Sequence, residues 1–134
     1  MIDINWKIVH TLPCKSIINT KLRAFQYKYL MKILPNNRFL YKCNITSTSL
    51  CDFCNMYIES NKHLFWECLV SRSFWTELEV FLNEKRININ LNYQTISLGL
   101  MDQSSYSNLL NCILIYAKYI IFKNKYAKNR TYIQ

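Results

Sequence analysis

The sequence has few of the residues that break regular structure and few acidic side chains. It contains one glycine and two prolines in 134 residues, which excludes an all-β sandwich, because such a fold needs many turns. Only eight acidic residues accompany seventeen lysines and arginines. Just over half of the residues are hydrophobic, so the chain can build a core, and disorder along its whole length is excluded. We expect one mainly α-helical domain.

No targeting segment is predicted from this sequence either. Met1 to His10 lacks a basic stretch followed by an apolar core, so no secretory signal is predicted. The longest apolar stretch, Leu109 to Phe122, is shorter than the roughly 20 residues that span a bilayer. Asn111 and Lys118 interrupt it, so a buried helix is favoured over a membrane anchor. Six cysteines without a secretory signal predict a reducing, intracellular location, nuclear or cytoplasmic, with no membrane partner.

Four side chains in the middle of the chain stand at metal-ligand spacing, in the pattern C-x2-C-x8-H-x4-C: Cys51, Cys54, His63 and Cys68. Such a set can close a tetrahedral shell around Zn²⁺, and a closed shell is structural rather than catalytic. Two alternatives remain, a disulfide or redox pair and unliganded core side chains. The isolated cysteines fit the second alternative well, and these are Cys14, Cys43 and Cys112.

The spacing of the last two candidate ligands also predicts local structure. His63 and Cys68 are five residues apart, or about 140° around a regular helix, so one such helix would point them in different directions. We therefore expect His63 in a turn or short helical piece and Cys68 at the start of the next helix. The positive end of that helix favours a thiolate. Glu59 is either a hydrogen-bond acceptor for the His63 ring or an ordinary exposed glutamate.

Apolar periodicity predicts helices over residues 16–34, 69–83 and 106–128, and a short helical turn over 38–43 with Phe39 and Leu40 inward. The first helix has Ser16 or Thr20 as its cap and the stripe Ile18, Leu22, Phe25, Tyr29 and Ile33. The 69–83 helix has the stripe Val70, Phe74, Leu78 and Leu82, which Trp75 and Phe81 broaden. The last helix has Ser104 or Ser105 as its cap and the stripe Leu109, Ile113, Tyr116 and Ile120. Residues 87–93 alternate apolar and polar, which indicates a strand or an extended connector.

The positive charge is concentrated at the two ends of the chain. Residues 1–50 carry a net charge of +7, residues 51–104 carry −3 and residues 105–134 carry +5. This distribution indicates a polyanionic partner, RNA or DNA first, although a solubilising basic surface is the alternative. The candidate phosphate contacts lie in the first and last predicted helices and are Lys21, Arg23, Lys28, Lys32, Lys123, Lys125, Lys128 and Arg130.

Several blocks together resemble a known family. They are Thr-Lys-Leu-Arg-Ala-Phe-Gln-Tyr-Lys at 20–28, Asn-Arg-Phe-Leu at 37–40, Cys-Asp-Phe-Cys at 51–54, His-Leu-Phe-Trp-Glu-Cys at 63–68 and Phe74-Trp75. Over residues 4 to 85 the chain resembles the zinc-binding region at the C-terminal side of non-LTR (LINE-type) retrotransposon reverse transcriptases. The basic last helix and Ser97-Leu98-Gly99-Leu100 match more loosely.

The resemblance implies four Zn²⁺ ligands and a role in holding template RNA or target DNA during target-primed reverse transcription. It also makes upstream reverse transcriptase domains a candidate partner, with this chain either attached to them or a separated fragment. We expect the zinc-binding domain over residues 1–104, with its ligands at 51–68, and a basic helix over 105–134.

Two further function classes compete with nucleic-acid binding. In a protein-interaction module the zinc only folds the chain, and the helix over 109–122 docks on a partner. An enzyme is disfavoured, because no glycine-rich phosphate loop or Ser/His/Asp set is present. Paired aspartates for polymerase metal ions are also missing, since Asp3, Asp52 and Asp102 are far apart in sequence.

Overall fold

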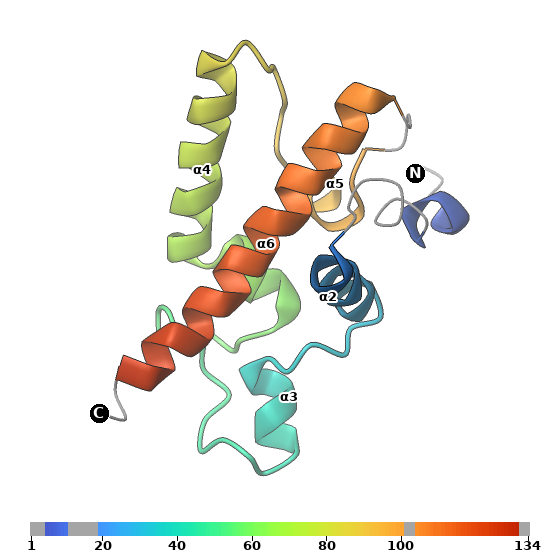
Figure 1. The fold of residues 1–134 in the computed structure, drawn as a ribbon. Helices are drawn as coiled ribbons and strands as arrows, with labels where there is room; N and C mark the ends of the chain where they lie inside the picture. Colours follow the sequence, from blue (N-terminus) through green and yellow to red (C-terminus); the bar gives the residue numbers. More distant parts are fainter. Residues whose placement is uncertain (1–4, 11–18, 101–103, 132–134) are drawn as a thin grey trace. The chain divides into compact units, whose positions relative to one another are not determined.

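The protein is built from helices joined by turns (Figure 1). The structure is a computed structural model that describes residues 5–10, 19–100 and 104–131, with side chains described as far as Lys125. Residues 6–10 are helical. The elements that follow are α2 (Thr20–Leu30), α3 (Asn37–Lys42), the π-helical segment η1 (His63–Glu67), α4 (Leu69–Glu84), α5 (Tyr93–Leu98) and α6 (Ser105–Thr131). Within these ranges only an isolated bridge between Leu50 and Ile58 is β-like, so the mainly α prediction is confirmed.

Contacts divide the chain into two compact units, each made from separate stretches of sequence. Unit 1 comprises residues 1–34 and 94–120, and unit 2 comprises residues 35–93 and 121–134. Helix α6 therefore contributes its first part to unit 1 and its last part to unit 2. The candidate metal ligands all belong to unit 2. No helix in the described ranges is long and apolar enough to cross a membrane.

Short polar side chains begin the helices. The Asn19 side chain accepts hydrogen bonds from the backbone N–H groups of Lys21 and Leu22 at the start of α2. Asn36 caps α3 in the same way, and the Ser104 hydroxyl accepts from Ser107 N–H in α6. These contacts satisfy N–H groups that have no partner within the helix. The expected cap at Ser104 is confirmed, Asn19 takes the role expected of Thr20, and Ser16 lies outside the described residues.

Three helices end in the same way although the chain has almost no glycine. Lys32, Asn44 and Arg86, each the second residue after α2, α3 and α4 respectively, have φ angles of 59°, 60° and 62°. The N–H of the following residue then donates to a carbonyl five positions back, as in Ile33 to Lys28 and Ile87 to Leu82. This Schellman arrangement normally places glycine in the left-handed position. Here lysine, asparagine and arginine occupy it instead.

The buried face of α6 includes polar side chains that the predicted stripe did not contain. Asn111, Lys118 and Lys125 recur at steps of seven and are all at most 2% exposed. Leu109 and Tyr116, by contrast, are more than half exposed, so the predicted stripe through them is wrong. Polar groups with partners can face inward, and a hydrophobic pattern alone does not detect them.

Two buried polar side chains of α6, Asn111 and Lys118, have partners in unit 1. Asn111 exchanges two hydrogen bonds with the backbone of Leu100. The Lys118 ammonium donates to Gln26 Oε1 at 2.5 Å and lies 4.1 Å from the Tyr29 ring centroid. Ser97 joins the same group, because its hydroxyl lies 2.7 Å from the Tyr29 hydroxyl. A polar network therefore ties α2, α5 and α6 together inside unit 1.

The predictions for the buried side chains of α2 and α3 are correct only in part. Leu22, Phe25 and Tyr29 form the buried face of α2, but Ile33 is exposed, because the chain leaves the helix at Leu30. Ile18 lies outside the described residues. Phe39 is half exposed rather than inward.

The inward face of α4 agrees with the predicted one in part, since Leu82 and Trp75 are buried as expected, whereas Phe81 is half exposed. Its buried residues are Ser71, Trp75 and Leu82, while Val70 is half exposed. Residues 87–92 form neither helix nor strand, so the extended connector is the correct alternative.

Candidate metal centre

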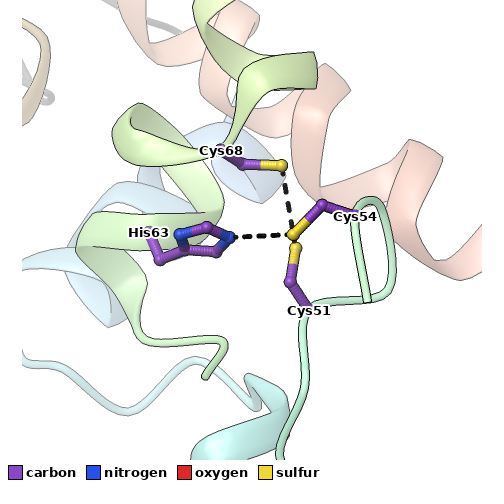
Figure 2. A group of neighbouring side chains, drawn as sticks. All are labelled: Cys51, Cys54, His63 and Cys68. Atoms are coloured by element: carbon purple, nitrogen blue, oxygen red, sulfur yellow. Dashed lines mark hydrogen bonds between the residues drawn. The ribbon is translucent and has the colours of Figure 1, made fainter. Parts of the chain in front are cut away.

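The four candidate ligands converge in unit 2. The ligand atoms of Cys51, Cys54, His63 and Cys68 all lie within 4.8 Å of one another, and Figure 2 shows the side chains directed at a common point. Cys51 Sγ is 3.9 Å from Cys68 Sγ, and Cys54 Sγ is 3.4 Å from His63 Nε2. The described cysteines are all free thiols, so a disulfide does not explain the cluster.

These separations match the edges of a tetrahedron around zinc. Bond lengths of about 2.3 Å to sulfur and about 2.05 Å to nitrogen give edges of about 3.8 Å between two sulfurs and about 3.6 Å between sulfur and nitrogen. Cys51 and Cys68 are almost fully buried, and His63 is 6% exposed. Three thiols and one imidazole form one of the usual donor sets of closed structural zinc sites. The residues present therefore fit Zn²⁺.

A widened helical turn brings His63 and Cys68 to the same side. Residues His63–Glu67 form a π-helical segment, closed by a hydrogen bond from Cys68 N–H to the His63 carbonyl at 2.8 Å. This i to i+5 bond brings Cys68 back over His63. In a regular α-helix two residues at this spacing would point in different directions. Cys68 is then the N-cap of α4. The short helical piece and the helix start expected from the spacing are both confirmed.

Two side chains of α4 stabilise the widened turn by donating hydrogen bonds to its carbonyl groups. The Ser71 hydroxyl donates to the Leu64 carbonyl, and Trp75 Nε1 donates to the Phe65 carbonyl at 2.6 Å. Leu64 and Phe65 are themselves fully buried, and the Phe65 ring stacks against Phe122 of α6. Buried carbonyls need partners, so α4 fixes the segment that carries His63 and Cys68.

The other two ligands lie on a tight turn. Asn55 N–H donates to the Cys51 carbonyl at 2.8 Å, and Cys51 N–H donates to the Tyr57 carbonyl at 2.8 Å. Asn55 has a φ angle of 56°, a conformation that asparagine adopts more readily than most residues. The turn directs both sulfurs to the same side.

The two thiols of this turn differ in acidity. Burial alone would raise the pKa of Cys54, but hydrogen bonds from Met56 N–H, the His63 ring and Tyr57 N–H lower this pKa to about 7. Burial raises the pKa of Cys51 well above its usual range. A bound metal ion must therefore displace the proton from Cys51, as zinc does from its thiol ligands.

Glu59 has a role that the sequence did not reveal. Its carboxylate is fully buried and accepts hydrogen bonds from Asn37 N–H and Asp52 N–H, both at 2.9 Å. Both sequence-based alternatives, a partner of the His63 ring and an exposed glutamate, are therefore wrong. Lys125 Nζ lies 3.0 Å from Glu59 Oε1 and also pairs with Asp52. The sequence offers one signal that could have connected Glu59 and Lys125 with the metal centre. This signal is the position of their partner Asp52 between the two cysteines of the C-x2-C pair.

The residues predicted to contact phosphate differ in how far their side chains are exposed to solvent. Lys21, Lys28 and Lys32 are exposed and Arg23 is half-buried, all in or next to α2 of unit 1. On α6, Lys123 is exposed, whereas Lys125 is fully buried and ion-paired. Lys128 and Arg130 belong to α6, and their side chains lie outside the described ones. Lys125 is therefore not available at the surface.

Three cysteines and one histidine that can close a tetrahedral shell around zinc define the class of the protein, which is a structural zinc-binding domain. The comparison with known families gives the particular family. The family model described as zinc-binding in reverse transcriptase matches residues 3–75, which include all four ligands and more than half of the chain. The chain belongs to this family of zinc-binding reverse transcriptase domains. Neither a curated protein nor a solved structure matches it.

Proposed function

We propose that this chain is a non-catalytic nucleic-acid-binding module whose zinc centre is structural. We further propose that it derives from the C-terminal region of a LINE-type reverse transcriptase, attached to the polymerase domains or separated from them. The sequence blocks at residues 20–28, 37–40 and 63–68 support this parentage. RNA or DNA is the expected partner, in the nucleus or cytoplasm, where free thiols stay reduced.

The observation that carries the proposal is the charge of unit 1. Its described residues contain no aspartate or glutamate. In the same unit Lys21, Lys28 and Lys32 are exposed, at the start, in the last turn and just after the end of α2. Because no described carboxylate of this unit neutralises them, these ammonium groups give it a positive surface. The phosphate groups of RNA and DNA bind surfaces of this kind, because lysine and arginine neutralise them.

Salt dependence is the direct test of this mechanism. Binding that neutralises phosphates releases counterions, so the affinity falls as salt rises. We would measure the anisotropy of labelled single-stranded RNA, single-stranded DNA and a duplex over a salt series. A variant with Lys21→Gln, Lys28→Gln and Lys32→Gln should weaken binding and reduce the slope of log affinity against log salt by about 2 on single strands.

A matched control variant tests whether the position of the three lost positive charges matters, or only their number. Lys62→Gln, Lys85→Gln and Arg86→Gln remove three exposed cations from unit 2 and likewise include one residue with positive φ. This control should bind almost as well as the original chain. Equal losses in the two triple variants, or an affinity that salt does not change, would refute phosphate binding by α2.

The zinc centre supports a non-catalytic assignment. A catalytic zinc keeps one coordination position for water or substrate. Here a fourth protein ligand, the almost fully buried Cys68, stands at that position. With Co²⁺ in place of Zn²⁺, the visible absorption should be that of a four-coordinate centre with three sulfur ligands. If anions that can take the place of a bound water changed the spectrum, the metal would have an open coordination position, and this result would argue against a purely structural centre.

A second candidate function is supported by an exposed apolar groove next to the metal centre. The groove has a volume of about 740 Å³, and its lining includes the ligands Cys54 and His63. Met56, Tyr57 and Leu69 line it and are each more than 60% exposed. Exposed apolar patches of this kind often bind proteins. On α6, Leu109 and Tyr116 also leave part of the apolar surface uncovered.

Size-exclusion chromatography with and without nucleic acid separates the two functions. A Leu69→Ser, Met56→Ser variant should bind nucleic acid as the original chain does if α2 makes the contacts. Self-association that these substitutions abolish, in a chain without measurable nucleic-acid binding, would favour the protein-interaction module instead.

A further inference from the structure

The ammonium group of Lys125 is buried at the centre of a network in unit 2. Lys125 and Glu59 are both fully buried. Lys125 Nζ lies 3.0 Å from Glu59 Oε1 and 3.0 Å from Asn37 Oδ1, and it also donates to Asp52 Oδ2. Burial alone would lower the pKa of Lys125, but the two carboxylates raise it above its usual value. The side chain is therefore charged at neutral pH.

The partners of Lys125 hold the turn that carries two metal ligands. Glu59 accepts a hydrogen bond from Asp52 N–H, directly after Cys51. The Asn37 side-chain amide donates to the Leu50 carbonyl at 2.8 Å, directly before Cys51, and to Asp52 Oδ1 at 2.9 Å. The backbone on both sides of Cys51 is thus fixed by groups that Lys125 contacts.

The charges explain why a cation is needed there. A zinc ion with three thiolates and one neutral imidazole has a net charge of about −1. Asp52 and Glu59 place two more negative charges close to the ligand turn, and Lys125 is ion-paired with both. Without Lys125 these two partly or fully buried carboxylates would repel each other and the thiolates.

We propose that Lys125 is a positioning residue of the metal centre, which holds Asp52 and Glu59 from α6 and thereby keeps the Cys51–Cys54 turn in the metal-binding conformation. The centre then depends on a residue far beyond the matched segment 3–75. This role concerns the metal centre alone and does not depend on nucleic-acid binding.

The test is metal retention in the chain of 134 residues. Zinc release to a coloured chelator and the affinity for Co²⁺, followed by its visible absorption, would be measured for Lys125→Met. Substitution of groups that orient metal ligands typically weakens metal binding about 10- to 100-fold, and we expect a loss in this range. Lys123→Met is the matched control, because Lys123 is exposed on the same helix. It should release zinc at the rate of the original chain.

Two further variants separate positioning from general loss of stability. Leu82→Ala removes a buried side chain from α4 and should lower the unfolding midpoint while leaving the zinc affinity of the folded chain unchanged. Asp52→Asn combined with Lys125→Met removes one buried negative charge together with the cation. This double variant should retain metal better than Lys125→Met alone, even if that single variant folds poorly.

The proposal is overturned by any of three results. Lys125→Met retains zinc like the original chain, or Leu82→Ala loses zinc equally fast, or the added Asp52→Asn gives no recovery. The first result would make the network irrelevant to the metal. The other two would reduce Lys125 to a contributor to overall stability.

Discussion

Cys54 Sγ and His63 Nε2 face each other at 3.4 Å across the metal centre, one from a tight turn and the other from the first residue of a π-helical segment. Unless an ion joins them, two thiols and an imidazole would be buried with poor partners. Metal binding should therefore be coupled to the folding of unit 2.

We predict that a Cys51→Ser, Cys54→Ser variant loses its zinc and the packing of unit 2. Structural zinc sites contribute apparent binding free energies of about 10–16 kcal/mol, more than the total stability of most small domains. Metal analysis should fall from one zinc per chain to almost none, and the near-ultraviolet circular dichroism, to which the buried Trp75 contributes, should weaken. Cys43→Ser is the control, because Cys43 is an exposed free thiol. A double variant that keeps its zinc would disprove the ligand assignment.

A second prediction concerns the stability of unit 1 as a function of pH. Burial lowers the pKa of the Lys118 ammonium well below its usual value of 10.5. Unfolding exposes this amine, which then binds a proton at any pH below 10.5, so the unfolded state holds more protons than the folded state. The contribution of Lys118 to the free energy of unfolding therefore rises with pH between the lowered folded pKa and 10.5, by up to about 1.4 kcal/mol per pH unit.

The comparison of wild-type chain with Lys118→Met isolates this effect. Urea unfolding at about pH 7 and about pH 9, with reductant and zinc present, should show the wild type gaining stability relative to the variant as pH rises. Lys123→Met, on the exposed side of the same helix, should keep the wild-type slope. Parallel pH profiles for wild type and Lys118→Met would show that the buried amine stays protonated.

The sequence predicted the metal ligands because their chemistry and spacing are local, and it predicted most helices because apolar residues recur along them. It failed where buried polar groups have distant partners. Glu59 and Lys125 are sixty-six positions apart, and Lys118 and Gln26 are ninety-two apart. A hydrophobic pattern assigns such residues to the surface, and that shifted the predicted face of α6. The widened turn at His63 was equally hidden, because propensities do not distinguish a π-turn from a helix.

A third prediction concerns this widened turn. Trp75→Phe should destabilise the protein by about 1–3 kcal/mol, because it leaves the buried Phe65 carbonyl without its hydrogen-bond donor. Zinc release to a chelator should become faster, since the same turn places His63 and Cys68. Trp66→Phe is the matched control. Trp66 is half-buried and contacts the Arg72 guanidinium, so its loss should change stability by about 1 kcal/mol or less.

Equal effects of the two tryptophan substitutions would contradict this account of the turn. Ser71→Ala offers an independent check, because the Ser71 hydroxyl donates to the neighbouring Leu64 carbonyl. It removes a donor with little change in volume. Like Trp75→Phe, Ser71→Ala should destabilise the protein and make zinc release faster.

The last prediction follows from the scarcity of glycine. Arg86, the second residue after α4, has a φ angle of 62°, where a side chain with a Cβ atom is strained by roughly 1–2 kcal/mol. Arg86→Gly removes this strain but gives the unfolded chain more freedom, so a net gain of about 0.5–1 kcal/mol in unfolding free energy is expected. Lys85→Gly is the control with the same change of charge. Lys85 has a φ angle of −85°, so glycine there should lower stability. If thermal or urea unfolding showed both substitutions shifting stability in the same direction, charge rather than backbone conformation would be the cause.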